Sequence, residues 1–205
     1  MITEQAEPTK SSRGAATERI ILGIDPGTTV MGFGVLHAQG GHVRLVEADA
    51  IRFPAEDDHT LKLRAIFRHV LHIIGKHRPD ELAIEAQFFG KNVQSMLKLG
   101  RAQGVAIAAA LHRDIPVVEY APRRVKQSIT GRGAATKEQV AAMLSSILGP
   151  QALPGSTDAT DAVAVALCHY FSSGPPRPTG APRAADRKGG GWDSFIRNNP
   201  ERVKK

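Results

Sequence analysis

The sequence predicts an α/β fold, with a five-stranded mixed sheet flanked by helices, from two features of its hydrophobic pattern. Three apolar stretches between residues 20 and 53 are joined by short glycine-containing turns, which is typical of an antiparallel meander. After residue 58 the apolar residues recur at helical spacing, and helices alternate with two short strands. Strands that follow such helices pair in parallel, so we expect a mixed sheet with helices on both faces.

The first three strands are delimited by turns. Residues 20–24 are apolar or glycine, which is typical of a strand buried on both faces, and this run ends at Asp25 before the turn PGTT. The second strand is expected at residues 30–37. A Gly-Gly turn then leads to a third strand at 42–53, which alternates in part between apolar and polar residues.

Helices and short strands alternate over the following residues. A helix is expected at residues 58–77, with Asp58 as its N-cap and Pro79 ending the pattern. Thr136 and Gln139 form a capping box that begins another helix. The remaining expected elements are strands at 81–85 and 115–120, a helix at 92–113, a helical piece after Pro122 and a final helix at 157–171.

The composition divides the chain into one domain and two terminal segments. Residues 1–18 are polar and without periodicity, so we expect a flexible N-terminal arm. Residues 19–173 carry all the expected elements and form the one domain. Residues 174–205 are rich in Gly, Pro, Arg and Lys, which predicts a flexible basic tail. Within it, residues 192–203 hold the single Trp and two further apolar residues at helical spacing, so this segment is either solvated tail or a docking peptide.

Cysteine and histidine usage excludes several classes of protein. A single cysteine, Cys168, leaves no internal disulfide framework and fits a reducing compartment. No apolar run is long enough to span a bilayer, and the N-terminus lacks the apolar core of a signal peptide. We therefore expect a cytoplasmic protein without membrane association. The eight histidines have no cysteine partners at ligand spacing, which argues against a histidine metal site.

The net charge of +7 is unevenly distributed, which indicates a polyanionic partner. The tail has eight basic and three acidic residues, whereas the domain is nearly neutral. Within the domain, nine basic residues between Lys91 and Lys137 face only two acids, which predicts a positive surface for nucleic acid. Lys126 and Lys137 flank the loop TGRG. They could contact phosphates, or they could be solvated lysines on exposed faces. The expected DNA contacts are Lys91, Arg123, Lys126, Arg132 and Lys137.

Four acids are placed where they could converge. Asp25 and Glu85 each close a buried strand, and on parallel neighbouring strands they would lie side by side at one sheet edge. Asp158 and Asp161 are three residues apart in the first turn of the last helix, so they share a face. Each acid alone also has a structural explanation, since Asp25 could open a turn and Asp158 could favour the helix dipole. Glu85 could pair with a nearby base.

Taken together, the four acids indicate a metal site. Converging carboxylates repel one another unless cations lie among them. Oxygen ligands without cysteine or histidine favour two Mg²⁺ ions, with Mn²⁺ as a substitute. Paired ions held by these carboxylates could activate a water and stabilise the leaving oxygen in phosphodiester hydrolysis. One of the two phenylalanines just after Glu85, Phe88 or Phe89, is expected to stack on or wedge between bases, and the other to lie in the core.

A smooth stripe is expected on the helix at residues 92–113. Gly100, Gly104 and Ala108 recur there every four residues, which would let a second helix approach closely, as in a homodimer interface. The same stripe could equally pack on the chain's own sheet.

Five motifs stand in order along residues 20–173: ILGIDPGTTVMGFGV, LAIEAQFFGKN, SMLKLGRAQGVAIAAAL, EYAPRRVKQSITGRGAATKEQV and TDATDAVAVALCH. Together they resemble the RuvC family of bacterial Holliday-junction resolvases. The resemblance implies a ribonuclease H-like fold and a homodimeric endonuclease. It further implies metal-dependent nicking of two strands of like polarity across a four-way DNA junction, in homologous recombination and DNA repair.

The resemblance also implies roles for individual residues. The family's catalytic acids match Asp25, Glu85, Asp158 and Asp161. Phe88 matches the aromatic residue that contacts junction bases, and Lys126 and Lys137 match the basic residues near the scissile phosphate. Work alongside the RuvA and RuvB branch-migration proteins is implied as well, with Trp192 in the tail as a candidate contact.

Two other functions are compatible with parts of the sequence. GIDPGTT resembles the phosphate-binding turn of the actin, Hsp70 and sugar-kinase superfamily of ATPases, but those proteins need a second such turn, which this sequence lacks. A junction-binding protein that does not cut is the other alternative. A binding protein without activity should have lost some of the four acids, and because all four are present, this alternative is less favoured.

Overall fold

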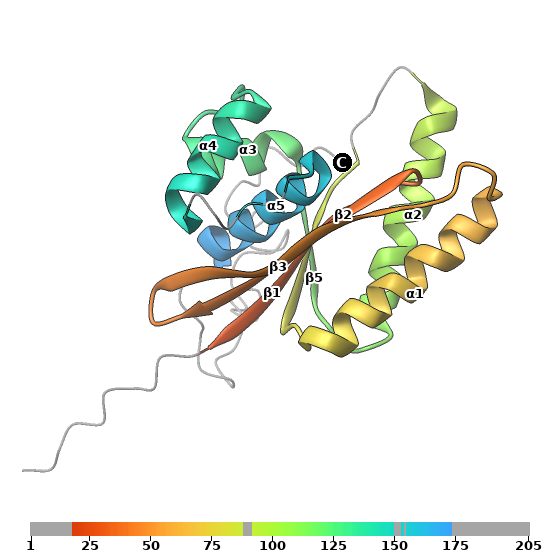
Figure 1. Cartoon of the computed structure of the whole chain (residues 1–205), viewed down its shortest axis with the longest axis horizontal. Helices are drawn as coiled ribbons and strands as arrows, with labels where there is room; N and C mark the ends of the chain where they lie inside the picture. Colours follow the sequence, from red (N-terminus) through yellow and green to blue (C-terminus); the bar gives the residue numbers. More distant parts are fainter. Residues whose placement is uncertain (1–17, 88–91, 150–152, 154, 174–205) are drawn as a thin grey trace, which may run out of the picture. The chain divides into compact units, whose positions relative to one another are not determined.

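The computed structural model describes residues 18–87, 92–149, 153 and 155–173 (Figure 1). Several expectations therefore lie outside the described residues. These are the N-terminal arm apart from Glu18, the tail at 174–205 with its segment 192–203, and the side chains of Phe88 and Lys91.

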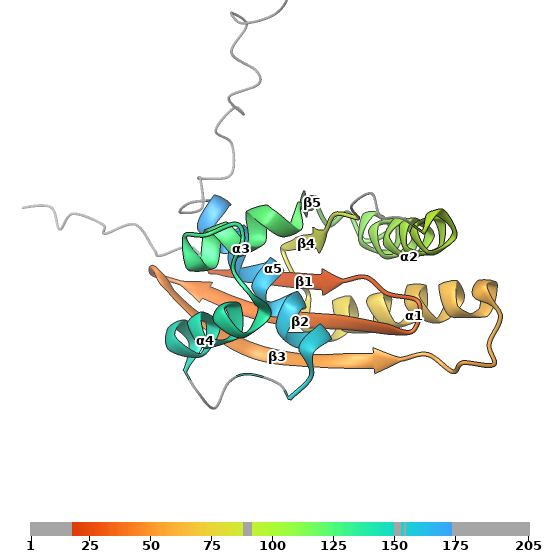
Figure 2. The same cartoon turned by 90° about the horizontal axis from the view of Figure 1, so that it is seen from above.

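The sheet has five strands in the order β3-β2-β1-β4-β5 (Figure 2). β1 pairs antiparallel with β2, and β2 pairs antiparallel with β3, which confirms the expected meander. β4 pairs in parallel with both β1 and β5, so the sheet is mixed as predicted. The strands are β1 Arg19–Asp25, β2 Val30–Gln39, β3 His42–Arg52, β4 Glu81–Glu85 and β5 Val117–Tyr120.

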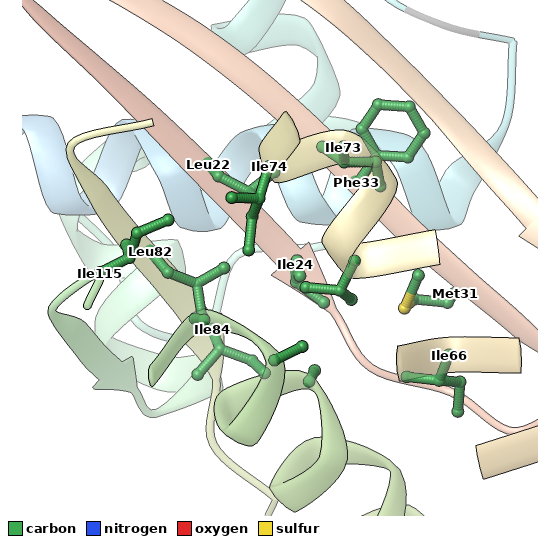
Figure 3. Close-up of a cluster of buried hydrophobic side chains, with 14 of the residues drawn as sticks. Leu22, Ile24, Met31, Phe33, Ile66, Ile73, Ile74, Leu82, Ile84 and Ile115 are labelled. Atoms are coloured by element: carbon green, nitrogen blue, oxygen red, sulfur yellow. The ribbon is translucent and has the colours of Figure 1, made fainter. Parts of the chain in front are cut away.

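Helices cover both faces of this sheet (Figure 1). α1 (His59–His77) and α2 (Val93–Leu111) pack against one face, through a core cluster that includes Leu22 and Ile24 of β1 (Figure 3). α3 (Pro122–Thr130), α4 (Lys137–Leu148) and α5 (Thr157–Ser173) pack against the other face, around Ile21 and Ala83. Alternate residues of β1 thus enter opposite cores, which explains why the strand is apolar without a polar face.

The helix starts follow the predicted caps. The Asp58 carboxylate accepts a hydrogen bond from the backbone N–H of Leu61 at 2.8 Å and begins α1. Thr136 and Gln139 form the reciprocal capping box at the start of α4. Each cap satisfies backbone donors that the first helical turn leaves unpaired, and the second fixes where Lys137 enters the structure.

Several strand boundaries differ from expectation. β1 and β2 are longer than expected, at Arg19–Asp25 and Val30–Gln39. β5 begins at Val117 rather than at residue 115, because Ile115 is buried under α2 and Pro116 has no N–H to donate. The carbonyl of Pro116 still accepts from the N–H of Leu82 at 2.9 Å. β3 ends at Arg52, and the N–H of Phe53 turns to the carbonyl of Thr29 at 2.9 Å.

A polar network ties the end of α5 to the start of β1 and β4. Arg19 Nη1 lies 3.2 Å from Glu81 Oε2, and His169 Nε2 lies 3.0 Å from the same oxygen. The other ring nitrogen of His169 lies 2.9 Å from the hydroxyl of Tyr120. The contact with His169, with a smaller contribution from Arg19, holds the pKa of Glu81 below its usual range. The network anchors the C-terminal part of α5 to the starts of β1 and β4.

No helix within the described ranges is long and apolar enough to cross a bilayer.

Candidate active site

Asp25 and Glu85 are neighbours at the carboxyl end of two parallel strands. Ile24 of β1 pairs with Ile84 of β4, so the next residue on each strand is an acid at the same edge of the sheet. Both side chains are partly buried. The sequence predicted this juxtaposition, and the register shows it.

α5 approaches the sheet closely enough to bring two more acids to this edge. Gly32 pairs with Asp25 across β1 and β2, and a Cβ built on Gly32 would lie 2.0 Å from the carbonyl oxygen of Asp158. On Gly23, a Cβ would lie 2.2 Å from the carbonyl oxygen of Ala162. Helix backbone occupies the space that side chains would need, so only glycine allows this contact. The start of α5, with Asp158 in its first turn and Asp161 just beyond it, therefore lies over the end of β1.

Asp25 and Glu85 are close enough to neighbouring acids for those charges to change their protonation. Burial is the largest cause, followed by the charges of Glu85, Asp161 and Asp158, and together they raise the pKa of Asp25 to about 7. Burial and the Asp161 carboxylate also raise the pKa of Glu85. Burial disfavours the charged form of a carboxyl group, and neighbouring negative charges do the same. The cluster is thus a site of high negative potential that a cation would stabilise.

Two predicted lysines lie at this cluster. Lys137 Nζ donates to Asp161 Oδ2 at 2.6 Å, and this hydrogen bond is the main cause of the raised pKa of Lys137. Lys126 of α3 exerts a charge effect on Glu85 that opposes the rise of its pKa. Glu85, Lys126, Lys137 and Asp161 all line one cavity between α3, α4, α5 and the end of β4. Acids and lysines thus share one opening.

The donor set fits hard divalent cations, although the side chains must rotate to bind one. Among the described side chains, no three of His, Cys, Asp or Glu converge closely enough to ligate one ion. Four carboxylates without a thiol match the oxygen ligands that Mg²⁺ and Mn²⁺ prefer, and a dication would offset the burial and the repulsion that together raise the pKa of Asp25. To bind a cation through Oδ2, Asp161 must release Lys137.

The two other described residues predicted to contact DNA do not line the cavity of Glu85 and Asp161. Arg123 and Arg132 are exposed, on α3 and just after it, and the stem of Arg123 packs under Gly133. They extend the basic surface beyond the two lysines. Phe88 and Lys91 remain predictions.

The predicted stripe on α2 faces away from the chain's own sheet. Gly100, Gly104 and Ala108 are exposed, and a Cβ on either glycine would meet nothing within 4 Å. Val93 and Leu97, on the same side, are 65% and 51% exposed. Of the two alternatives left open by the sequence, packing on the chain's own sheet is therefore excluded.

Sequence reasoning missed two features of the site. The first is Gly32, whose role was signalled by the alternating glycines of VMGFGV, since two residues apart on a strand they leave one face bare. The second is the contact between Lys137 and Asp161. Nothing local in the sequence indicates it, because the two residues lie on different helices.

Comparison with known proteins gives consistent similarities. A family model described as crossover junction endodeoxyribonuclease RuvC matches residues 21–169. Curated proteins with that name are 54% identical in Bacteroides fragilis, over 91% of this chain and 97% of the relative, and 52% identical in Cytophaga hutchinsonii, over 91% and 89%. The structure of Thermus thermophilus RuvC in complex with Holliday junction substrate is 35% identical, with a TM-score of 0.71 over 76% of this chain and 94% of that one.

Proposed function

The chain belongs to the RuvC family of crossover junction endodeoxyribonucleases, and from this premise we propose that it resolves four-way DNA junctions by metal-dependent phosphodiester hydrolysis. The observation that carries the proposal is the meeting of Asp25, Glu85 and the first turn of α5 at one sheet edge, beside two lysines. The similar Thermus thermophilus protein is in complex with a Holliday junction, which supports the same substrate here.

The four acids are the proposed metal ligands. Asp25 is central, because its pKa responds to the charges of all three other acids, and it would contact both of two ions. When bound, Mg²⁺ or Mn²⁺ would supply an activated water and stabilise the leaving oxygen, giving 5′-phosphate and 3′-hydroxyl ends. The carboxylates orient these groups, and their partial burial limits competing contacts with bulk water.

The basic residues around the cavity position the DNA backbone. Lys126 and Lys137 line the same opening as Glu85 and Asp161, so a phosphate held by them would lie next to the acids. The exposed Arg123 and Arg132 would contact flanking phosphates. Beyond the described residues, we propose that Phe88 contacts junction bases and that Lys91 adds a further phosphate contact.

A homodimer built on α2 would match the symmetry of the substrate. The exposed stripe of Gly100, Gly104 and Ala108 allows close helix approach, and Val93 and Leu97 extend it with apolar surface. A two-fold dimer would present two sites to a two-fold junction and would place paired nicks in strands of like polarity. We propose this assembly, acting in recombination and repair in the cytoplasm.

The tail is proposed to serve partner contacts. Residues 19–173 would form the nuclease domain, with residues 1–18 as a flexible arm and residues 192–203 as a docking peptide for the RuvA and RuvB proteins. Deleting residues 174–205 should weaken affinity for those partners without changing nicking of a junction. Unchanged partner affinity would contradict this assignment.

The central experiment is a nicking assay on a synthetic four-way DNA junction with Mg²⁺, beside a linear duplex and an RNA–DNA hybrid. We expect symmetric nicks confined to the junction, lost in Asp25→Asn while junction binding persists. A junction that is bound but left intact by the wild type would favour a binding protein without activity. Cleavage of the hybrid instead would overturn the proposed substrate.

A further inference from the structure

Lys137 makes its contact with a carboxylate that the proposed function requires for metal binding. Its Nζ lies 2.6 Å from Asp161 Oδ2, at hydrogen-bonding distance. An ammonium group at this distance uses an oxygen that a divalent ion would also need. The two cations therefore compete for Oδ2 of Asp161.

The pair also lines two cavities. One is lined by Glu85, Lys126 and residues of α3 and α5, and the other by residues of α4 and the first turn of α5, including Ser156 and Thr160. Lys137 and Asp161 line both. The contact therefore borders open space on both sides, into which the ammonium can move.

The ammonium group of Lys137 is well suited to move away from Asp161. The capping box of Thr136 and Gln139 fixes its backbone at the start of α4, whereas its side chain is 63% exposed. The lysine stem is long and flexible, and an ion pair open to water contributes little to stability. Its ammonium can thus swing to a nearby phosphate while its Cα stays in place.

We propose that Lys137 is a tethered counter-ion, whose ammonium is displaced from Asp161 by a divalent metal ion and thereby becomes available to a DNA phosphate. This proposal rests on the proposed metal-dependent nuclease function and adds a coupling between its two ligands. Metal binding strengthens DNA binding through Lys137, and DNA, by holding the ammonium, strengthens metal binding to the same degree, since such coupling is reciprocal.

A simple loss of positive charge would also favour metal binding, so the test needs a matched control. Lys126 lines the same cavity and affects Glu85 through its charge. Lys126→Met removes an equal charge without removing the contact to Asp161. Lys137→Met should therefore raise the affinity for the metal more than Lys126→Met does. This additional gain should require the Asp161 carboxylate.

The first experiment measures Mn²⁺ binding to the full chain without DNA, by isothermal titration calorimetry. We expect Lys137→Met to tighten Mn²⁺ binding by about three- to tenfold relative to Lys126→Met, which corresponds to about 0.7–1.4 kcal/mol. In the Asp161→Asn background the two lysine variants should have equal effects. The proposal would be overturned if, in the chain that keeps Asp161, Lys137→Met and Lys126→Met changed Mn²⁺ affinity equally. Weaker Mn²⁺ binding in Lys137→Met would overturn it as well. Absence of Mn²⁺ binding by the wild type would instead overturn the proposed metal site itself.

A second readout follows the freed ammonium. The salt dependence of junction affinity is measured with and without Mn²⁺, on junctions that a denaturing gel shows to be intact. Adding Mn²⁺ should steepen the slope of log affinity against log salt by about 0.9 more in the wild type than in Lys137→Met, because one additional phosphate contact forms. The same metal-induced change in both proteins would show that Lys137 is not released. Matching thermal melting curves establish that the variant is folded.

Discussion

Gly32 of β2 faces the carbonyl oxygen of Asp158 so closely that a Cβ at this position would lie 2.0 Å from it. Gly32 is also the residue that pairs with Asp25 across β1 and β2. This glycine therefore helps to set the separation between the acid on the sheet and the acids on α5.

Substituting this glycine should damage the site more than the fold. Gly32→Ala places a methyl group against helix backbone, which cannot move aside as a flexible side chain would, so the first turn of α5 must shift. We expect a loss of about 1–3 kcal/mol in the free energy of unfolding and a far larger fractional loss of Mg²⁺-dependent nicking. Gly75→Ala in α1, where a Cβ meets nothing within 4 Å, is the control and should keep full activity. Normal nicking by Gly32→Ala would show that the distance is not critical.

Asp25 should make the protein less stable as the pH rises toward neutrality. Its pKa is about 7 in the folded protein, against about 3.9 in an unfolded chain. Between these values the folded state binds more protons than the unfolded state, so the stability contributed by protonated Asp25 is present at low pH and is lost through pH 7. Asn does not titrate. Asp25→Asn should thus gain stability relative to the wild type, by an amount on the order of a few kcal/mol at pH 8 and near zero at pH 4.

Urea denaturation in EDTA at several pH values measures this difference. Asp57→Asn, in the loop before α1, is the control for a general effect of removing an acid. Excess Mg²⁺ at pH 8 should stabilise the wild type but not Asp25→Asn, since a ligand stabilises only the state that binds it. A pH-independent difference between the two proteins would contradict the raised pKa.

Lys126 should contribute one phosphate contact. Lys126→Ala is expected to lower junction affinity for all sequences and to reduce the slope of log affinity against log salt by about 0.9. Lys62→Ala, on α1 and so against the other face of the sheet, provides the control. If Lys126→Ala leaves the slope unchanged, the side chain points away from the DNA.

The exposed stripe of α2 should hold the dimer together. Ala108→Glu places a charge on this stripe and should shift the protein to monomers in sedimentation velocity, with paired nicking of the junction lost. Ala142→Glu makes the same substitution at an exposed position of α4 and should leave the oligomeric state unchanged. A stable dimer in Ala108→Glu would place the interface elsewhere.

The strands, helices and caps follow from local patterns in the chain. The apolar run of β1, the caps at Asp58 and Thr136, and the acids at the ends of β1 and β4 are all visible as residue types at short spacing. Such patterns act within a few residues, where backbone hydrogen bonding and side-chain period are decided. The parallel pairing of β1 with β4, and thus the meeting of Asp25 with Glu85, could be inferred because helical crossovers favour it.

Long-range packing decided the rest. How closely α5 lies on the sheet depends on Gly23 and Gly32 meeting helix backbone, and its position along the sheet depends on the contacts of His169 with Glu81 and Tyr120. The contact of Lys137 with Asp161 joins residues 24 positions apart on two helices. These distances arise only when separate elements pack together. The sequence therefore identifies the acids and lysines, whereas the packing of the domain sets their separations, protonation and partners.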